Sequence, residues 1–170
     1  MRRRLVGAVA AGAALAGMAT AVAPAAGAAE RGAGASASVW RNIVIDGTYT
    51  IRDDEGLSAG TYCNGNVATE SWVNEERTPY LWWSTTCGGE IRTEMHVSAQ
   101  TDAGGGARVF VTLMLFEGTT DTNDDRDAFV EFDRYIPADK LTRPGEIALL
   151  SVENGGKDWA KFNLTLRNTA

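Results

Sequence analysis

Hydrophobic and polar residues alternate along several stretches of this chain, most clearly in residues 91–99. Met95 and Val97 fall on one face of that stretch, with Ile91, Thr93 and Ala99, whereas Glu94 falls on the other. A period of two residues is typical of a β-strand with one face in the core and one in water. Residues 158–167 alternate in the same way, and their expected inner face is Ala160, Phe162, Leu164 and Leu166.

Shorter apolar or alternating stretches predict seven further strands, at residues 39–45, 48–52, 67–73, 80–86, 108–116, 128–135 and 147–152. Residues 108–116 are apolar on both faces, which indicates a central strand covered on both sides. Between the strands, Asp46-Gly47 predicts a hairpin turn and residues 60–66 a loop. Residues 138–143 are expected to form one helical turn.

No amphipathic stretch is long enough for a helix of about ten residues, which is close to the average helix length in globular proteins. Eight or nine short strands separated by turn signals predict an all-β, single-domain antiparallel β-sandwich, and a β-barrel is the alternative. We expect this domain to span residues 39–170.

The first 28 residues have the pattern of an export signal. Three arginines are followed by an uncharged Ala/Gly/Leu/Val stretch, and Ala26-Gly27-Ala28 supplies small residues for cleavage. Residues 29–38 are rich in Ala, Gly and Ser and are expected to form a flexible leader. The sequence therefore predicts a secreted, extracellular protein without membrane insertion after cleavage; a retained membrane anchor is the competing interpretation.

The chain is acidic, with a formal net charge of −6 that becomes −9 once the three arginines of the signal are removed. A negative surface repels the phosphates of nucleic acid and of anionic membranes, so neither is an expected partner. Cys63 and Cys87 are the only two cysteines and both lie in the exported part. We expect them to form one disulfide, worth about 3.5 kcal/mol for a loop of about 25 residues.

An acidic segment carries the sharpest local pattern, with oxygen-bearing side chains at the alternate positions Asp121, Asn123, Asp125 and Asp127. Calcium takes about six to eight oxygen ligands, and alternate spacing lets a loop wrap around it. Arg126 replaces the glycine of an EF-hand loop and strands replace its helices, so an EF-hand is excluded. The two interpretations are a calcium-binding loop of a β-sandwich and a solvated acidic turn.

Four aromatic residues, Trp72, Tyr80, Trp82 and Trp83, form the candidate ligand-binding set. Tyr80 and Trp82 share one face of their strand and Trp83 lies on the other. Exposed rings stack on sugars or on apolar side chains of a protein surface, so an extracellular glycan or protein is the expected partner. The alternative is that these rings fill the core beside the disulfide.

Catalytic patterns are weak, and no catalytic residue is predicted. The lone histidine, His96, lies beside Glu94 and Ser98, but neighbours two apart on a strand lack the convergence of a nucleophile relay. The acids Glu131 and Asp133 have a spacing nominally within the range for glycosidases, but acids on the water-facing side of a strand are common. A non-enzymatic binding module is therefore the first hypothesis. The second is a protease inhibitor that uses the disulfide-braced loop between Cys63 and Cys87, which carries the segment 74–79, and a hydrolase comes last.

The calcium hypothesis predicts a thermal shift. Unfolding in millimolar calcium should occur several degrees higher than in EDTA, because a ligand of the native state adds RT ln(1 + [L]/Kd) to the stability. Asp125→Ala should abolish the shift. Equal unfolding temperatures at tens of millimolar calcium would make the segment a solvated acidic turn.

Overall fold

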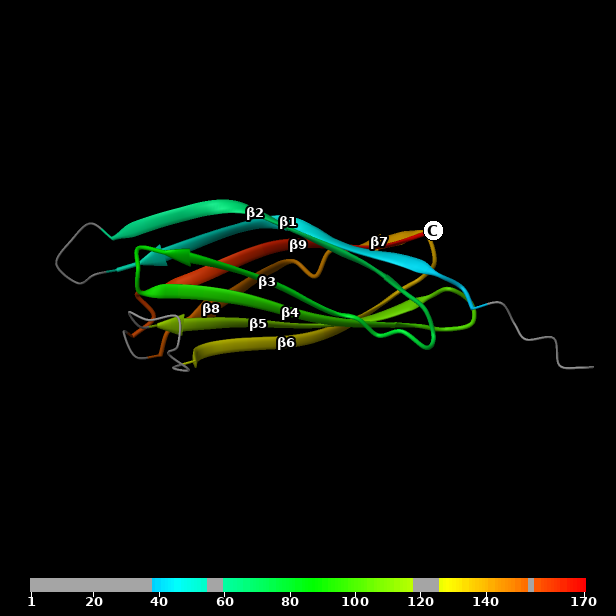
Figure 1. Cartoon of the computed structure of the whole chain (residues 1–170). Coiled ribbons are helices and arrows are strands. Elements are labelled where there is room, and N and C mark those ends of the chain that lie inside the picture. The colour runs from blue at the N-terminus through cyan, green and yellow to red at the C-terminus, as the bar shows by residue number, and fades with distance from the viewer. Residues whose placement is uncertain (1–37, 55–59, 118–125, 153–154) are drawn as a thin grey trace, which may run out of the picture. The chain divides into compact units, whose positions relative to one another are not determined.

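A computed structural model describes residues 38–54, 60–117, 126–152 and 155–170 of the chain. These residues form nine strands in two antiparallel sheets and contain no helix, so none that could cross a membrane (Figure 1). The strands are β1 Arg41–Asp53, β2 Thr61–Val73, β3 Tyr80–Cys87, β4 Ile91–Thr101, β5 Ala107–Glu117, β6 Arg126–Ile136, β7 Lys140–Thr142, β8 Glu146–Leu150 and β9 Trp159–Thr169. The all-β fold is confirmed, and the sheets do not close into a barrel.

The two sheets lie face to face as layers, as expected for a β-sandwich (Figure 1). The five-stranded sheet has the order β2-β1-β9, and both β7 and β8 pair with the far edge of β9. The four-stranded sheet is the meander β3-β4-β5-β6. The chain therefore enters the first sheet, builds the whole second sheet, and returns to complete the first.

The core lies between the sheets and is built by the predicted alternation. In β4, Met95 and Val97 are buried with the other inner positions, and in β9 Phe162 and Leu166 are completely buried. Side chains of β1, β5 and β8 complete the core, among them Ile43, Ile45, Ile51, Val109, Val111, Leu113, Leu115 and Leu149. Burial of a large aliphatic or aromatic side chain contributes about 2 kcal/mol, so this core provides most of the drive to fold.

The predicted hairpin at Asp46-Gly47 is wrong, because β1 runs straight through it. Gly47 lies in the middle of β1, opposite Val67 of β2 and Leu164 of β9. A Cβ atom at Gly47 would overlap the backbone carbonyl oxygen of Asn163. The glycine therefore allows the central strands β1 and β9 to approach closely. The dipeptide Asp-Gly is also frequent in turns, so the sequence alone does not separate the two roles.

Two more local predictions are wrong for a related reason. Residues 60–66, expected to be a loop, form the first half of β2, and residues 138–143, expected to be helical, contain β7. The first segment pairs with β1 and the second with β9. These backbone hydrogen bonds outweigh the weak preference of the local sequences for loop or helix. Pro144-Gly145 then interrupts the edge strand between β7 and β8, a position where proline is tolerated.

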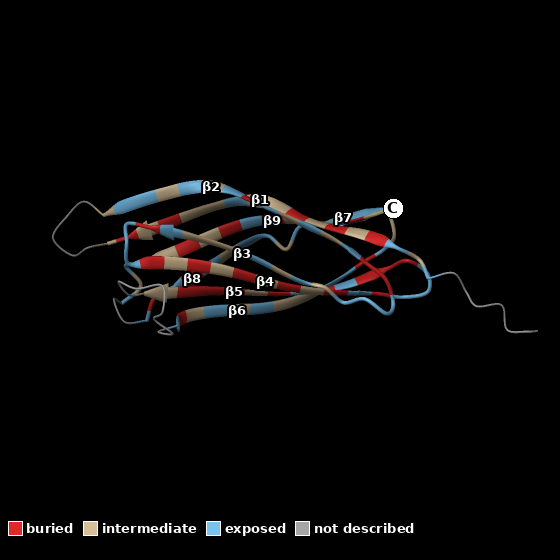
Figure 2. Cartoon of the chain, in the orientation of Figure 1, coloured by how far each residue is buried: buried red, intermediate tan, exposed pale blue. Residues whose placement is uncertain are grey.

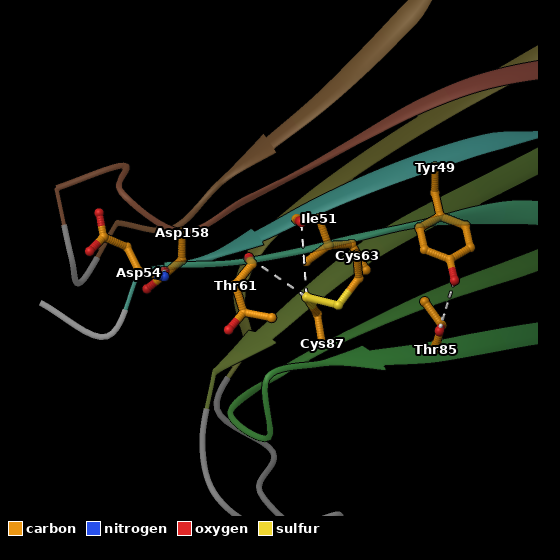
Figure 3. The surroundings of a disulfide bond; sticks show 8 residues. All are labelled: Tyr49, Ile51, Asp54, Thr61, Cys63, Thr85, Cys87 and Asp158. Atoms are coloured by element: carbon orange, nitrogen blue, oxygen red, sulfur yellow. Dashed lines mark hydrogen bonds between the residues drawn. A yellow bond between two sulfur atoms is a disulfide. The ribbon is translucent and has the colours of Figure 1, made fainter. Parts of the chain in front are cut away.

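The predicted disulfide is confirmed. Cys63 of β2 and Cys87 of β3 are joined with a Cα–Cα distance of 5.7 Å, so the bond links an edge strand of one sheet to an edge strand of the other. Figure 3 shows it beside Ile51 and Thr61, while the Tyr49 hydroxyl lies 3.3 Å from that of Thr85 across the same interlayer space. The bond therefore fixes the spacing of the layers on this side.

Near the C-terminal end of β9, away from the disulfide, one buried polar residue connects β9 with β1, the β4–β5 turn and the end of β6. Asn168 is completely buried, and its Nδ2 donates hydrogen bonds to the carbonyl oxygens of Gly105 (2.8 Å) and Ile136 (3.0 Å). Its Oδ1 accepts one from Nε of Arg41 (2.9 Å), whose guanidinium also contacts Asp139. All of these buried polar groups are thus satisfied by one another.

Asn168→Ala should lower the free energy of unfolding by about 3 kcal/mol, because it leaves two buried carbonyls and a buried guanidinium without their partner. Urea denaturation followed by tryptophan fluorescence measures this. Asn163→Ala, on the exposed face of the same strand, should change the stability by less than about 0.5 kcal/mol. Equal losses in the two variants would contradict the role assigned to Asn168.

Candidate ligand-binding face

The outer side of the four-stranded sheet carries most of the exposed aromatic side chains that the structure describes. We call this side the aromatic face; its rings are Tyr80, Trp82, Phe110, Phe129 and Tyr135, each at least 45% exposed. They stand at outward positions of β3, β5 and β6, because their neighbours in sequence point into the core. No other element covers this side within the described residues (Figure 2).

Strand register places these side chains in rows across the sheet. One row contains Tyr80, Ser98, Phe110 and Asp133, and the next contains Trp82, His96, Thr112 and Glu131. Neighbouring strands are about 4.8 Å apart, so Tyr80 and Phe110, two strands apart, are separated by about 10 Å. Each row thus presents a ring, a polar side chain from β4, and a further ring or polar group.

The polar side chains of β4 are linked to one another and to the rings. Glu94 forms a salt bridge with Arg92 (3.0 Å from Nε to Oε1), and its other carboxylate oxygen lies 2.9 Å from Nε2 of His96. The His96 ring packs edge-on against Tyr80, with centroids 5.3 Å apart. Desolvation and the charge of Glu94 raise the pKa of Tyr80, so its hydroxyl stays protonated and able to donate.

An open depression lies between β5 and β6 on the same face. Phe110, Thr112, Glu131 and Asp133 line it. Asp133 forms a salt bridge with Arg108, whereas Glu131 accepts only a long 3.4 Å hydrogen bond from Thr112. Rings, hydroxyls and carboxylates therefore meet in one accessible hollow.

The structure brings together only part of the predicted aromatic set. Tyr80 and Trp82 share the aromatic face, 64% and 56% exposed. Trp72 is 48% exposed but belongs to β2 of the other sheet. Trp83 points between the layers, where it packs on Tyr49 (5.2 Å between centroids) and Phe162 (6.1 Å), as the core alternative expects.

The sequence analysis missed three rings of this face, Phe110, Phe129 and Tyr135. Phe110 was assigned to a strand covered on both sides, but only Met114 among its outward neighbours is buried. The signal available in the sequence was the alternation of Phe129, Glu131, Asp133 and Tyr135 along β6. This alternation indicates that the outer side of β6 faces water. Because β6 pairs with β5, the outer side of β5, which carries Phe110, faces water as well.

The metal ligands predicted in the acidic segment are mostly outside the described residues, which include only Asp127. Asp127 is buried and accepts a hydrogen bond from Ser151 (3.1 Å), which also contacts Glu117 (3.0 Å). Among the residues that the structure describes, no three acidic, histidine or cysteine side chains are grouped as metal ligands. The calcium hypothesis therefore stays a prediction.

Known proteins give little to compare. No family model matches the chain, and no curated protein sequence matches it. Among solved structures, the chain is similar to the secretin InvG of the Salmonella SPI-1 type III secretion injectisome in its open gate state, with 11% identity and a TM-score of 0.32. The match covers 77% of this chain and 57% of that chain, so it spans little more than half of that protein's chain. Such a likeness supports no argument about function.

The carboxylates beside the acidic segment predict a pH-dependent stability. Burial, with the adjacent Asp127, raises the pKa of Glu117 from 4.5 to about 7. Between these values the folded protein holds a proton that the unfolded chain has released. The free energy of unfolding should therefore fall as the pH rises from about 4.5 to about 7.

Urea denaturation at a series of pH values in EDTA measures this fall. Glu117→Gln should remove it, because the amide does not titrate, whereas Glu131→Gln on the aromatic face should leave it in place. An unchanged profile in Glu117→Gln would show that Glu117 does not cause the pH dependence.

Proposed function

We propose that this protein is a secreted, non-enzymatic β-sandwich module that binds an extracellular glycan through its aromatic face. The observation that carries the proposal is the pair Tyr80 and Trp82, more than half exposed beside the hydrogen-bonding side chains of β4. A sugar ring has apolar C–H faces and polar hydroxyl edges. A surface that alternates aromatic rings with polar groups matches both.

The balance of charge on this face favours a neutral ligand. Its arginines are already engaged: Arg92 with Glu94, Arg108 with Asp133, and the guanidinium of Arg126 stacked over the Phe129 ring. A polyanionic ligand would need free cations, which these contacts do not offer. A neutral glycan needs only stacking and hydrogen bonds, which the face provides.

The first alternative, a protease inhibitor, receives less support from the geometry. Cys63 and Cys87 lie near the opposite ends of β2 and β3 from the segment 74–79. The distance along the strands is roughly 25–35 Å at about 3.3 Å per residue. The segment is held instead by Asn74, whose Oδ1 accepts hydrogen bonds from the backbone N–H groups of Glu76 and Arg77. The disulfide does not brace that loop directly.

Two features of the proposal rest on sequence alone. Export follows from the signal pattern of residues 1–28, and a structural calcium ion in the acidic segment follows from the spacing of its oxygen ligands. Both would suit a module that works outside the cell. A hydrolase stays the last alternative, because His96 and Glu94 meet on the aromatic face without a convergent nucleophile.

Isothermal titration with neutral β-linked hexasaccharides of glucose, xylose and N-acetylglucosamine tests the proposal. At least one should bind, and binding should quench tryptophan fluorescence because Trp82 contacts the ligand. Trp82→Ala and Tyr80→Ala should each weaken binding about tenfold or more, since a lost stacking contact costs about 1.4 kcal/mol or more.

Trp40→Ala is the matched control, because it removes a tryptophan of similar exposure that belongs neither to the four-stranded sheet nor to β2. It should leave glycan affinity unchanged. Binding that is lost equally in Trp40→Ala and Trp82→Ala, or no binding to any of the three sugars, would contradict the assignment to the aromatic face.

A further inference from the structure

The edge strand β2 is unprotected against pairing with another strand. It lies at the end of the five-stranded sheet, and within the described residues β1 is the one strand that pairs with it. The strand is thirteen residues long, Thr61–Val73, and its other side has no strand partner in the described part of the chain. Figure 2 shows much of β2 in the exposed colour, with no strand beyond it in its sheet.

The other sheet edges of this protein carry features that hinder pairing with a further strand. Natural sheets protect their edges with proline, lysine, bulges or inward-pointing charges. At the β7–β8 edge the chain has Lys140 and the interruption at Pro144-Gly145. At the β6 edge it has a register shift near Phe116 and a charged residue, Arg134, at an inner-face position. The β3 edge is short, with eight residues, and is tied to β2 by the disulfide.

Apart from the same disulfide, which ties its third residue, Cys63, to β3, β2 has none of these devices. Its sequence contains no proline, lysine or arginine, and Glu70 is its only charged residue. Its register with β1 is continuous over all thirteen pairs, without a bulge. The strand therefore offers a long and regular row of backbone donors and acceptors.

We propose that β2 pairs antiparallel with β2 of a second copy of this chain, around a two-fold axis at Val67. This register uses the whole strand, and it makes the outward side chains complementary. Tyr62 then faces Trp72 of the second copy, two rings that are each about half exposed in the single chain. Asn64 faces Glu70, and Asn66 faces Ala68.

The distribution of charge along β2 also favours pairing with β2 of a second copy. In this register each Glu70 lies opposite an uncharged asparagine, and the two glutamates are six positions apart, or about 20 Å. No like charges meet, and two aromatic cross-strand pairs form, each worth up to about 1 kcal/mol. A self-complementary strand favours a closed two-fold dimer over an open chain of copies, because each copy has one such edge.

Sedimentation equilibrium over a series of concentrations tests the proposal with the purified protein. The wild type should show a monomer–dimer equilibrium. Asn66→Lys combined with Ala68→Lys should yield monomer at every concentration, because the two lysines of one copy oppose those of the other. Asn163→Lys combined with Leu150→Lys adds the same charge at exposed positions of β9 and β8, and should dimerise like the wild type.

Cysteine cross-linking tests the register. Asn66→Cys and Ala68→Cys chains mixed under mild oxidation should form a covalent dimer, since these positions face each other, and either variant alone should cross-link much less. Wild-type protein that is monomeric up to its solubility limit would overturn the proposal. A dimer that survives the double lysine substitution, or that cross-links equally in all mixtures, would overturn it as well.

Discussion

The inner face of each sheet can be kept dry only by the other sheet, since the described residues contain no helix that could cover it. This constraint accounts for much of the molecule. Phe162 and Met95 become completely buried once the layers meet. It also means that both outer faces stay in contact with solvent, so large rings at outward positions, such as Tyr80 and Trp82, can stay exposed.

A disulfide and a buried hydrogen-bond network hold the layers together at opposite ends of the sandwich. The disulfide Cys63–Cys87 joins the β2 and β3 edges, and Asn168 connects β9 with the β4–β5 turn and the end of β6. The first acts by restricting the unfolded chain, the second by satisfying buried polar groups that would otherwise oppose folding. With both ends fixed, the aromatic face lies on a sheet held at two places, and such pre-organisation would lower the entropic cost of the binding proposed for it.

The sequence predicted those features that depend on local alternation and on the number of cysteines. The faces of β4 and β9 follow from a period of two, and the disulfide follows from a single pair of cysteines in a chain whose sequence predicts export. The errors come from information that is not local. Gly47 has the same neighbours in a turn as in a close strand contact, and Phe110 looks like a core residue unless the layer outside β5 is known to be absent. Trp82 and Trp83 are adjacent and equally apolar. Only the arrangement of the sheets determines that Trp83 packs against the core while Trp82 stays on the surface.

The two proposed surfaces are related by geometry. In an antiparallel pair of β2 strands the two-fold axis is perpendicular to the sheet, so the second copy continues the five-stranded sheet in its own plane. Both four-stranded sheets then lie on the same side of that plane, and both aromatic faces point in one direction. A polymeric ligand can engage both faces, and the second contact becomes intramolecular, which raises the overall affinity without any new contact. An edge that would be a liability in a monomer would thus, in the proposed dimer, place two copies of the proposed ligand-binding face side by side.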